Sequence, residues 1–435
     1  MKKIILIICA FSIGSIVHAH KGRDAGETRT ATVVQPVNAT DRIDIRAKNT
    51  DLVVESWNKN EVKVEATIRF DGKMTDKIAR FLDEFEDHVK SGIMYSGGRL
   101  SIDTNLDEPN KFQIGGSKVG LIVIGFSEKE LKLEYKISAP QKAIYDITHS
   151  YQDMQLIGDF DQMKISQYSG DLRGQKINKA EFSLKYGSAY FTQINTADMD
   201  IYEQEMEVGV LGTLELNTKY SEVEVEELGS METTSYETDY IIGNADQITG
   251  NFKYGEIEIT ETLKDADLDC YEVDIEANVV EKMHFRQSKY SSIRAKRISK
   301  LTYEQSYEDD TEIRSVGTFK SLNSKYGNHK MNVLTGSIDL KGYEDDFVIG
   351  ELDPAATSIS IEGKYLTLRT DVGNASFSIT GKVKYGKVNY DESVVNVKRY
   401  IKDNDELEIE LTSKNTGTNK VLISVNGYEI DVNLD

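Results

Sequence analysis

Apolar and polar residues alternate along most of the chain. Every second residue of 62–70 is apolar, and charged or hydroxyl side chains lie between them. A period of two that is rich in Val and Ile is typical of strands that bury one face. Over residues 75–91 the apolar positions change to helical spacing, between an expected N-cap at Thr75 and a stop at Gly92. The pattern therefore predicts a strand-rich chain with one short helix.

A tyrosine motif recurs from about residue 145 onward. Most copies are a Lys-Tyr dipeptide followed by Gly or Ser, with Ser150-Tyr151 as a weaker early copy and Lys364-Tyr365-Leu366 as a variant. From Tyr151 to Tyr365 the motif returns every 34–39 residues. This first series contains Tyr151, Tyr186, Tyr220, Tyr254, Tyr290, Tyr326, Tyr365 and Tyr385. A second series lies midway and mostly reads Tyr-Glu, at Tyr168, Glu203, Tyr236, Tyr271, Tyr307 and Tyr343. The repeat unit is therefore about 35 residues long and has two unlike halves of 17–18 residues.

A fixed period with strand patterning is the signature of a solenoid, because one unit cannot bury its own apolar face. No proline occurs between Pro140 and Pro354, as expected where every backbone N–H joins a ladder. The rival architecture is a β-propeller, but propeller blades need roughly 40–45 residues and four strands. We predict an all-β protein, a right-handed parallel β-solenoid.

The length of one coil is either 18 or 35 residues. In the first series tyrosine shares its phase with the apolar residues, whereas in the second it is often out of phase. We therefore expect two-faced coils of about 35 residues, in which each half-repeat keeps its own face. The phase step after tyrosine indicates a bulge or tight bend. Glycines would permit it at Gly187, Gly255, Gly327 and Gly386.

The expected organisation has four parts: a signal peptide at 1–19, an N-terminal β segment at 20–144, the solenoid at 145–400, and C-terminal cap strands at 401–435. The first part has two lysines, a short apolar run and a small residue at its end. Its removal would also remove Cys9 and take the net charge from −21 to −23. Cys270 would then be the only cysteine, so no intrachain disulfide is expected.

The expected mature chain resembles the adhesin-like β-strand-repeat family of bacterial cell-envelope proteins, which is largely defined as a domain of unknown function. The resemblance is carried by Ile-x-Ile, Asp-Leu-Val-Val and Val-x-Val-x-Ala between Ile43 and Ala66, by a strand leading to Ala-Pro at Tyr135–Pro140, and by the Tyr-Gly repeats. It implies a β-repeat fold in the cell envelope, and it brings no catalytic residues. The helix at 75–91 and the acidic repeats are not carried over from the family.

The charge balance excludes several classes of partner. The chain has 52 Lys and Arg against 73 Asp and Glu, so it offers no basic face for nucleic acid or for an anionic membrane surface. The longest apolar run after the leader, Val119 to Phe126, is far too short for a membrane span. Phosphate-binding glycine loops, Cys-x-x-Cys and the Gly-x-Ser-x-Gly elbow do not occur.

Two charged columns are candidate binding features. Lysines fall at equivalent places in the repeat, at Lys185, Lys219, Lys253, Lys289, Lys325, Lys364 and Lys384. In 35-residue coils they would form a like-charged column. Solvation and counter-charges such as Glu222, Glu224 and Glu256 are the interpretation we favour. Carboxylates recur at Glu237/Asp239, Glu308/Asp310 and Glu344/Asp346, with Asp309 and Asp345 added. They could attract Ca²⁺ or serve glycan cleavage, but we expect ordinary screening by salt.

The other candidates have simpler explanations. The tyrosines could bind sugars, but a stacking ladder along a thin β core is favoured. Glu84 and His88 lie four residues apart on the expected helix and could hold a metal, but a solvated helix face is favoured. Cys270 is expected to pack as a small buried side chain.

These observations predict an exported, non-enzymatic, adhesin-like or scaffold β-solenoid of the bacterial cell envelope. It would present a regular surface to a glycan or an envelope protein, in the periplasm, on the outer-membrane surface or outside the cell. We assign no catalytic, cofactor or metal residues and no cofactor. The alternative is a polysaccharide-active enzyme that uses acidic residues on one face. The oligomeric state is left open.

Overall fold

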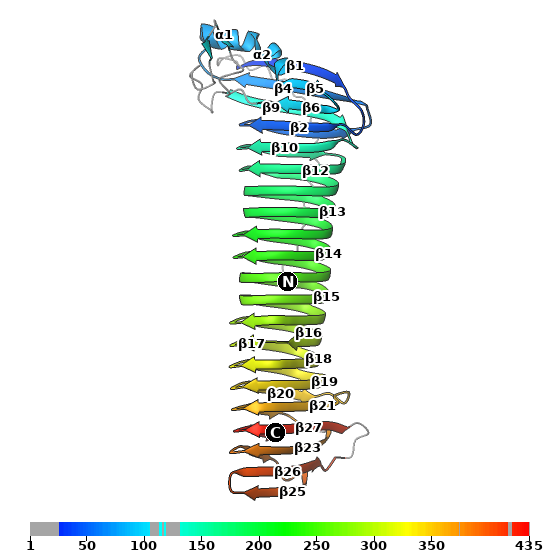
Figure 1. The fold of residues 1–435 in the computed structure, drawn as a ribbon, viewed down its shortest axis with the longest axis vertical. Coiled ribbons are helices and arrows are strands. Elements are labelled where there is room, and N and C mark those ends of the chain that lie inside the picture. Colours follow the sequence, from blue (N-terminus) through cyan, green and yellow to red (C-terminus); the bar gives the residue numbers. More distant parts are fainter. Residues whose placement is uncertain are drawn as a thin grey trace.

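The computed structural model describes residues 26–104, 113–114, 117–118, 131–373, 375–415 and 420–434. The expected signal peptide at 1–19 and the apolar run at 119–126 lie outside these residues. The described chain is mostly β, as predicted, and contains two short helices. The strands stack along one long axis, with residues near 30–100 at one end (Figure 1).

The N-terminal segment is a mixed sheet that closes one end of the stack. β1 pairs antiparallel with β4, β4 antiparallel with β9, and β9 parallel with β3. β2 and β3 then pair in parallel with β10 and β11, which joins this segment to the repeats. The strands are β1 (Glu27–Pro36), β2 (Arg42–Lys48), β3 (Asp51–Trp57), β4 (Glu61–Phe70), β5 (Ile93–Ser96), β6 (Arg99–Asp103), β7 (Gln113–Ile114), β8 (Ser117–Lys118) and β9 (Leu131–Pro140).

The predicted helix is present as two pieces, α1 (Asp76–Asp83) and α2 (Phe85–Ser91). The Thr75 side chain accepts a hydrogen bond from the Ile78 N–H, which makes Thr75 the N-cap, and Gly92 ends α2. The helices bury their apolar side chains beside β1 and cover that end of the stack (Figure 1). Burial of this edge protects its strands from pairing with another chain.

Parallel pairing with a short, nearly constant offset builds the repeats from β10 to β20. Glu227 pairs with Asn244 on the next strand, which gives an offset of 17 residues. Further along, Asp310 pairs with Asn328, and the offset is 18 residues. The strands are β10 (Ile144–Ser150), β11 (Met154–Ile157), β12 (Asp159–Tyr168), β13 (Leu172–Lys219), β14 (Glu222–Tyr236), β15 (Asp239–Lys289), β16 (Ser292–Tyr303), β17 (Ser306–Tyr307), β18 (Asp310–Lys325), β19 (Asn328–Tyr343) and β20 (Asp346–Leu352).

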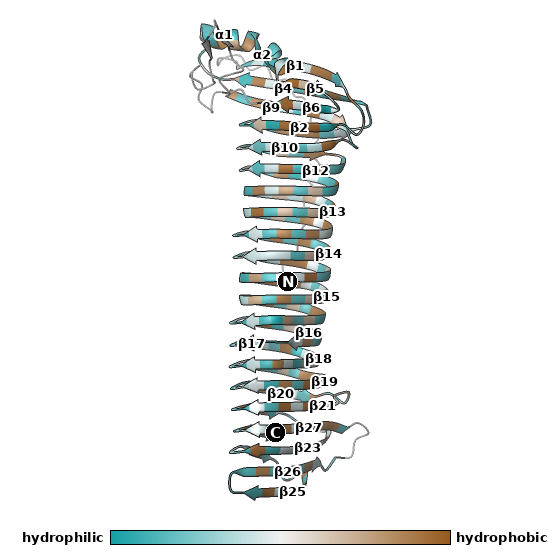
Figure 2. Cartoon of the chain, in the orientation of Figure 1, coloured by the Kyte–Doolittle hydropathy of each residue, from teal (hydrophilic) through white to brown (hydrophobic). Residues whose placement is uncertain are grey.

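The expected two-faced coil of about 35 residues is therefore wrong. One repeat of the structure, hereafter a coil, mostly has 17–18 residues, and the two unlike halves of the sequence repeat stack directly on each other. Within a coil the side chains alternate between a dry interior and solvent, and in Figure 2 hydrophobic and hydrophilic residues alternate along the strands. The inward residues of all coils form one continuous core.

Each coil closes through a residue with left-handed backbone. Its φ is +61° at Tyr186, +46° at Glu203 and +55° at Tyr220, and comparable residues follow in later coils. The sequence analysis expected glycine to permit the bend, but tyrosine or glutamate itself adopts this conformation. The glycine that follows has another role: a Cβ at Gly187 would lie 2.2 Å from the Gly170 carbonyl oxygen of the neighbouring coil. Close backbone approach explains that glycine.

A backbone hydrogen bond between coils accompanies the left-handed residue. The Tyr220 N–H donates to the Tyr236 carbonyl at 3.0 Å, and the Glu237 N–H donates to the Lys253 carbonyl at 2.8 Å. A non-glycine residue in this region costs of the order of 1–3 kcal/mol. The strain is tolerated because both neighbouring coils hold the corner in place.

The C-terminal residues do not lie at the end of the stack in sequence order. β27 (Lys420–Tyr428) pairs in parallel with both β21 and β23, so it is inserted between them (Figure 1). The end is formed by the antiparallel pair β25 and β26, and β26 also pairs antiparallel with β23. The strands are β21 (Ser358–Lys364), β22 (Thr367–Thr370), β23 (Ser376–Lys384), β24 (Lys387–Tyr390), β25 (Val395–Asp403), β26 (Glu406–Ser413), β27 and β28 (Asp431–Leu434).

The expected cap at 401–435 therefore contains two different structures. Residues 401–413 belong to the terminal hairpin, whereas 420–434 form an additional coil. The inserted segment repeats the coil pattern, since Val421, Ile423 and Val425 point inward and Tyr428-Glu429 has the corner dipeptide. A matching pattern allowed this segment to join the stack out of order.

Buried carboxylates lie inside the corner of two coils. The Asp345 carboxylate accepts hydrogen bonds from the Gly327 N–H at 2.7 Å, the Ser324 hydroxyl at 3.0 Å and the Tyr343 N–H at 3.2 Å. Asp309 accepts from the Ser291 N–H and the Ser306 hydroxyl. These groups satisfy corner donors in the dry interior. Burial raises the pKa of Asp345 to about 6, despite those hydrogen bonds.

The raised pKa of Asp345 predicts a specific pH dependence of stability. Because the folded-state value exceeds the ordinary value of 3.8, the contribution of Asp345 is complete below about pH 4 and is lost as the pH rises through about 6. Between these limits the native protein should lose up to about 3 kcal/mol relative to Asp345→Asn. Thermal unfolding at pH 4.5 and 7.5 checks this, with Asp159→Asn, an exposed carboxylate on β12, as the control. Identical pH profiles of the native protein and Asp345→Asn would contradict the assignment.

Candidate functional surface: the tyrosine ladder and the two faces beside it

One tyrosine per coil lines the corner, and together they form a continuous column, hereafter the ladder. Successive rings meet edge to face, with centroids 5.1–5.8 Å apart and interplanar angles of 65–83°. Its members, in spatial order, are Tyr151, Tyr168, Tyr186, Tyr202, Tyr220, Tyr236, Tyr254, Tyr271, Tyr290, Tyr307, Tyr326, Tyr343, Tyr365, Tyr428 and Tyr385. The favoured ladder interpretation of the tyrosines is thus confirmed.

The ladder explains why the sequence repeat is twice as long as the coil. In one coil the tyrosine is itself the left-handed residue, as at Tyr220; in the next it precedes that residue, as at Tyr236 before Glu237. Identical placement in every coil would leave neighbouring rings parallel at the strand spacing of about 4.8 Å. Shifting alternate tyrosines by one position lets each ring turn its edge to its neighbour, the arrangement that aromatic quadrupoles favour.

Two ladder members escaped the sequence analysis. It took Glu203 as the repeat mark, whereas the ring belongs to the preceding Tyr202, and it left out Tyr428. The Tyr-Glu dipeptide is present at both places. That dipeptide was therefore the signal that could have found them.

Lysines alternate with tyrosines on one flank of the ladder, and glutamates alternate with tyrosines on the other. Lys219 pairs with Tyr236 and Tyr236 with Lys253, so a tyrosine strand separates successive lysines. On the other flank, glutamates such as Glu237 alternate with tyrosines such as Tyr220. The expected lysine column on neighbouring strands is therefore wrong: lysines are two strands, or roughly 9.6 Å, apart.

The flanking glutamates also contact the phenol groups. The Glu203 carboxylate, a hydrogen-bond partner of the Tyr202 hydroxyl, raises the pKa of that phenol. The pKa of Tyr236 is raised by desolvation and by its hydrogen bond to Glu237. Tyrosines at the left-handed position are the more exposed set, and Tyr220 and Tyr290 are each 44% exposed. Seven of the eight tyrosines at the left-handed position are exposed, Tyr254 being half-buried, and Tyr168 is the one exposed member of the other set. The ladder therefore shows solvent an aromatic group in most alternate coils, between cationic and anionic flanks.

Beyond the glutamate flank lies an acidic strip. Glu205, Glu222 and Asp239 are direct neighbours on adjacent strands, and Glu207 and Glu224 form a second row. Among the described residues these carboxylates form no ion pair. Desolvation and then the neighbouring carboxylates raise the pKa of both Glu224 and Glu256. The strip consists of Glu205, Glu207, Glu222, Glu224, Glu226, Asp239, Glu256, Glu258, Asp274 and Glu276.

The acidic column expected from the sequence is not assembled as one group. Asp309 and Asp345 are buried inside the corner. Asp310 and Asp346 are separated by Asn328, whose side-chain amide donates to Asp310 at 2.9 Å. Asp239 belongs to the acidic strip, and so do Glu222, Glu224 and Glu256, which the sequence analysis interpreted as counter-charges of the lysines. The expected column failed because one coil has 17–18 residues. Equivalent residues of consecutive 35-residue sequence repeats therefore lie two strands apart and not on adjacent strands.

On the lysine flank the outward residues form a face with a shallow hollow of about 560 Å³, hereafter the hollow. It crosses four coils, and the outward threonines Thr234 and Thr249 leave the space that longer side chains fill elsewhere. Arg286 closes one end and is held by Asp269 at 2.8 Å. The outward lining residues are Asp198, Asp200, Glu215, Asn217, Glu232, Thr234, Thr249, Asn251 and Arg286.

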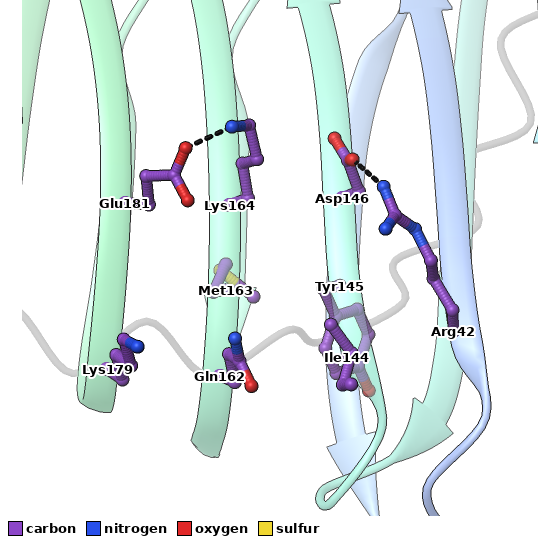
Figure 3. A pocket seen from close by; sticks show the side chains of 9 residues that line it. All are labelled: Arg42, Ile144, Tyr145, Asp146, Gln162, Met163, Lys164, Lys179 and Glu181. Carbon is purple, nitrogen blue, oxygen red and sulfur yellow. Dashed lines mark hydrogen bonds and ion pairs between the residues drawn. The ribbon is translucent and has the colours of Figure 1, made fainter.

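A smaller hollow of about 270 Å³ lies near the N-terminal end, across β2, β10, β12 and β13 (Figure 3). Its charges are already paired: Arg42 contacts Asp146, and Lys164 contacts Glu181 across neighbouring strands (Figure 3). Arg42 also contacts Asp44 at 2.7 Å. These pairs account for most of the polar lining, so the larger hollow is the better candidate site.

The remaining candidates occupy structural positions. Glu84 joins α1 to α2, and its carbonyl accepts from the His88 N–H. No group of three or more His, Cys, Asp or Glu side chains among the described residues could hold a metal ion. Cys270 is buried and unpaired, and burial raises its thiol pKa. No helix in the described part of the chain is long and apolar enough to cross a membrane.

Comparison with known proteins adds little. No protein-family model and no curated protein matches the chain. A matching crystal structure is that of a "putative cell adhesion protein" from Clostridium sporogenes, with 9% identity and a TM-score of 0.16. The match covers 94% of this chain and 100% of that one. At this TM-score the likeness carries no argument.

The ladder should contribute measurably to stability. Tyr236→Ala removes edge-to-face contacts with Tyr220 and Tyr254, so it should cost about 1–3 kcal/mol at roughly 0.5–1.5 kcal/mol for each contact. Tyr236→Phe keeps both contacts and should cost under about 1 kcal/mol. Chemical denaturation checks this, and equal losses for the two variants would contradict a structural role of the ring.

The acidic strip predicts a salt response. Moderate NaCl should raise the melting temperature, because it screens carboxylates that lack counter-charges. Glu224→Gln should stabilise at low salt by about 0.2–1 kcal/mol, and the gain should shrink as NaCl is added.

The control for this prediction is Glu181→Gln, because Glu181 pairs with Lys164 and its neutralisation should not stabilise. Calcium at matched ionic strength should act like NaCl. Extra stabilisation by millimolar calcium, removed by Glu222→Gln with Glu224→Gln, would show that the strip chelates calcium.

Proposed function

We propose that the protein is a right-handed β-solenoid of the bacterial cell envelope that acts as an adhesin-like scaffold, without catalysis. It would be exported, and it would hold an extended partner along its length. The fold part of this proposal is supported by parallel partners 17–18 residues apart over most of the repeats that the structure describes.

The single observation that carries the proposal is the unbroken ladder. Aromatic residues of a core point inward, whereas these rings stand at the corner, and seven of the eight tyrosines at the left-handed position have 39–49% of their surface exposed. Interfaces are enriched in tyrosine, because its rigid ring offers contact area at low entropic cost and its hydroxyl can hydrogen-bond. A row of identical sites along a stiff axis suits a polymeric or extended partner, since many weak contacts add up.

The regularity of the carboxylates supports binding over catalysis. An active site requires a specific cluster that interrupts a repeat, whereas the exposed carboxylates recur from coil to coil. The proposal therefore assigns no catalytic residue and no cofactor.

Sedimentation with isolated envelopes tests this function. Labelled mature protein should co-sediment with envelopes of its native cells, and Tyr220→Asn with Tyr290→Asn should weaken binding at least tenfold. Asparagine tolerates the left-handed backbone, so these variants should stay folded. Val210→Asn, equally exposed at 44% but outside the ladder, is the control. Unchanged binding of the double variant, or glycan chains shortened by the native protein, would contradict the proposal.

A further inference from the structure

The hollow lies directly beside the ladder. Its rows continue to the corner: the strand that carries Glu215 and Asn217 next presents Lys219, and the strand that carries Glu232 and Thr234 next presents Tyr236. No ladder tyrosine is among the described residues that line the hollow, so a ligand meets the aromatic column where it extends past the hollow toward the corner. The four strands that cross it extend over roughly 14 Å at the usual strand spacing.

The lining of the hollow is polar and mostly unpaired. Within the described residues, Glu232, Thr234 and Thr249 have no side-chain hydrogen bond or ion pair. Asn217 donates to Asp200 at 3.2 Å, which orients the amide and leaves the second carboxylate oxygen of Asp200 available. The hollow therefore offers hydroxyl, amide and carboxylate groups, which together both donate and accept hydrogen bonds.

One guanidinium stands at the end of this lining. Arg286 donates through Nε to Asp269 at 3.1 Å, and its Nη1 lies 3.5 Å from Asp267. Because these two carboxylates already balance its charge, Arg286 does not turn the hollow into an anion site. Its position is fixed, so its remaining N–H groups form a rigid set of donors at one end.

The charges decide which extended partner fits. Asp198, Asp200, Glu215 and Glu232 disfavour anionic polymers, in a chain that already carries a net charge of −21. The outward lining has no apolar side chain to anchor a hydrophobic peptide. A neutral sugar polymer meets both conditions, since its hydroxyls pair with the lining and the apolar face of a pyranose ring packs on tyrosine.

We infer that the hollow is a subsite for a neutral, extended glycan that lies along the stack, with sugar faces toward the ladder and hydroxyls bound by Asp200, Asn217 and Thr234. The inference rests on the proposed function and names its partner class. Beside the hollow Tyr220 is the exposed ring, and along most of the ladder exposed rings return every two coils, or roughly 9.6 Å. A β-linked glycan that repeats every two sugars has a comparable period, so successive disaccharides would meet equivalent rings.

Affinity electrophoresis of the mature protein tests this subsite. The gels contain a soluble neutral glycan, either hydroxyethylcellulose or glucomannan, or an anionic one, polygalacturonate. Thr234→Arg places a long side chain in the hollow, and Asn217→Ala removes one hydrogen-bonding group. Thr380→Arg makes the same change on an exposed residue of β23, far from the hollow, and is the matched control.

The expected result is retardation by a neutral glycan, at least tenfold weaker binding for Thr234→Arg, weaker binding for Asn217→Ala, and no change for Thr380→Arg. Equal retardation of Thr234→Arg and the native protein would overturn the subsite, as would stronger binding to polygalacturonate than to the neutral glycans. A third outcome separates the two proposals. If the protein co-sediments with envelopes, protease treatment of the envelopes abolishes this binding, and neither neutral glycan retards the protein, then the glycan inference is overturned and the scaffold function stands.

Discussion

A residue with left-handed backbone closes every coil. The tyrosine at or just before it sets the spacing and orientation of the tyrosine rings in the neighbouring coils. The backbone N–H of this residue donates to the neighbouring coil, so each corner is held by the coil that follows it. The ring then meets two other rings edge to face. Register, ladder and the separation of the two outer faces all depend on this corner.

Alternation at the corner has consequences beyond packing. Because tyrosine occupies the left-handed position in one coil and the preceding position in the next, the vacated places are taken by glutamate and lysine. Like charges are thereby kept two strands apart beside the ladder. The acidic strip lacks this arrangement, since Glu205, Glu222 and Asp239 occupy successive strands, and there the neighbouring carboxylates raise pKa values.

The sequence allowed the strands, the helix region and the ladder residues to be predicted because each depends on local periodicity. Thr75 and Gly92 mark the helix ends, and alternation around Val62 marks a strand. Coil length could not be read in the same way. The long period of the tyrosine motif was visible, but only three-dimensional ring packing shows that two unlike coils make one period.

Two features were beyond local reasoning. Insertion of β27 between β21 and β23 depends on a choice among several equivalent strand edges, and alternation around Val421 fits all of them. The hollow arises from side chains on four coils, where the outward residues Thr234 and Thr249 are small. No single repeat contains that information, so the candidate site emerged only from the stack.

Disulfide trapping tests the central claim most directly, namely that one coil is half as long as the sequence repeat. Glu205→Cys with Glu222→Cys places two thiols on paired residues of adjacent strands, within the Cα separation of about 4.4–6.8 Å that a disulfide needs. Glu205→Cys with Asp239→Cys places them two strands, or roughly 9.6 Å, apart. Under mild oxidation the first pair should close in the folded protein and the second should not. Rapid closure of the second pair, with the first left reduced, would show that one coil spans the whole sequence repeat and contradict this account.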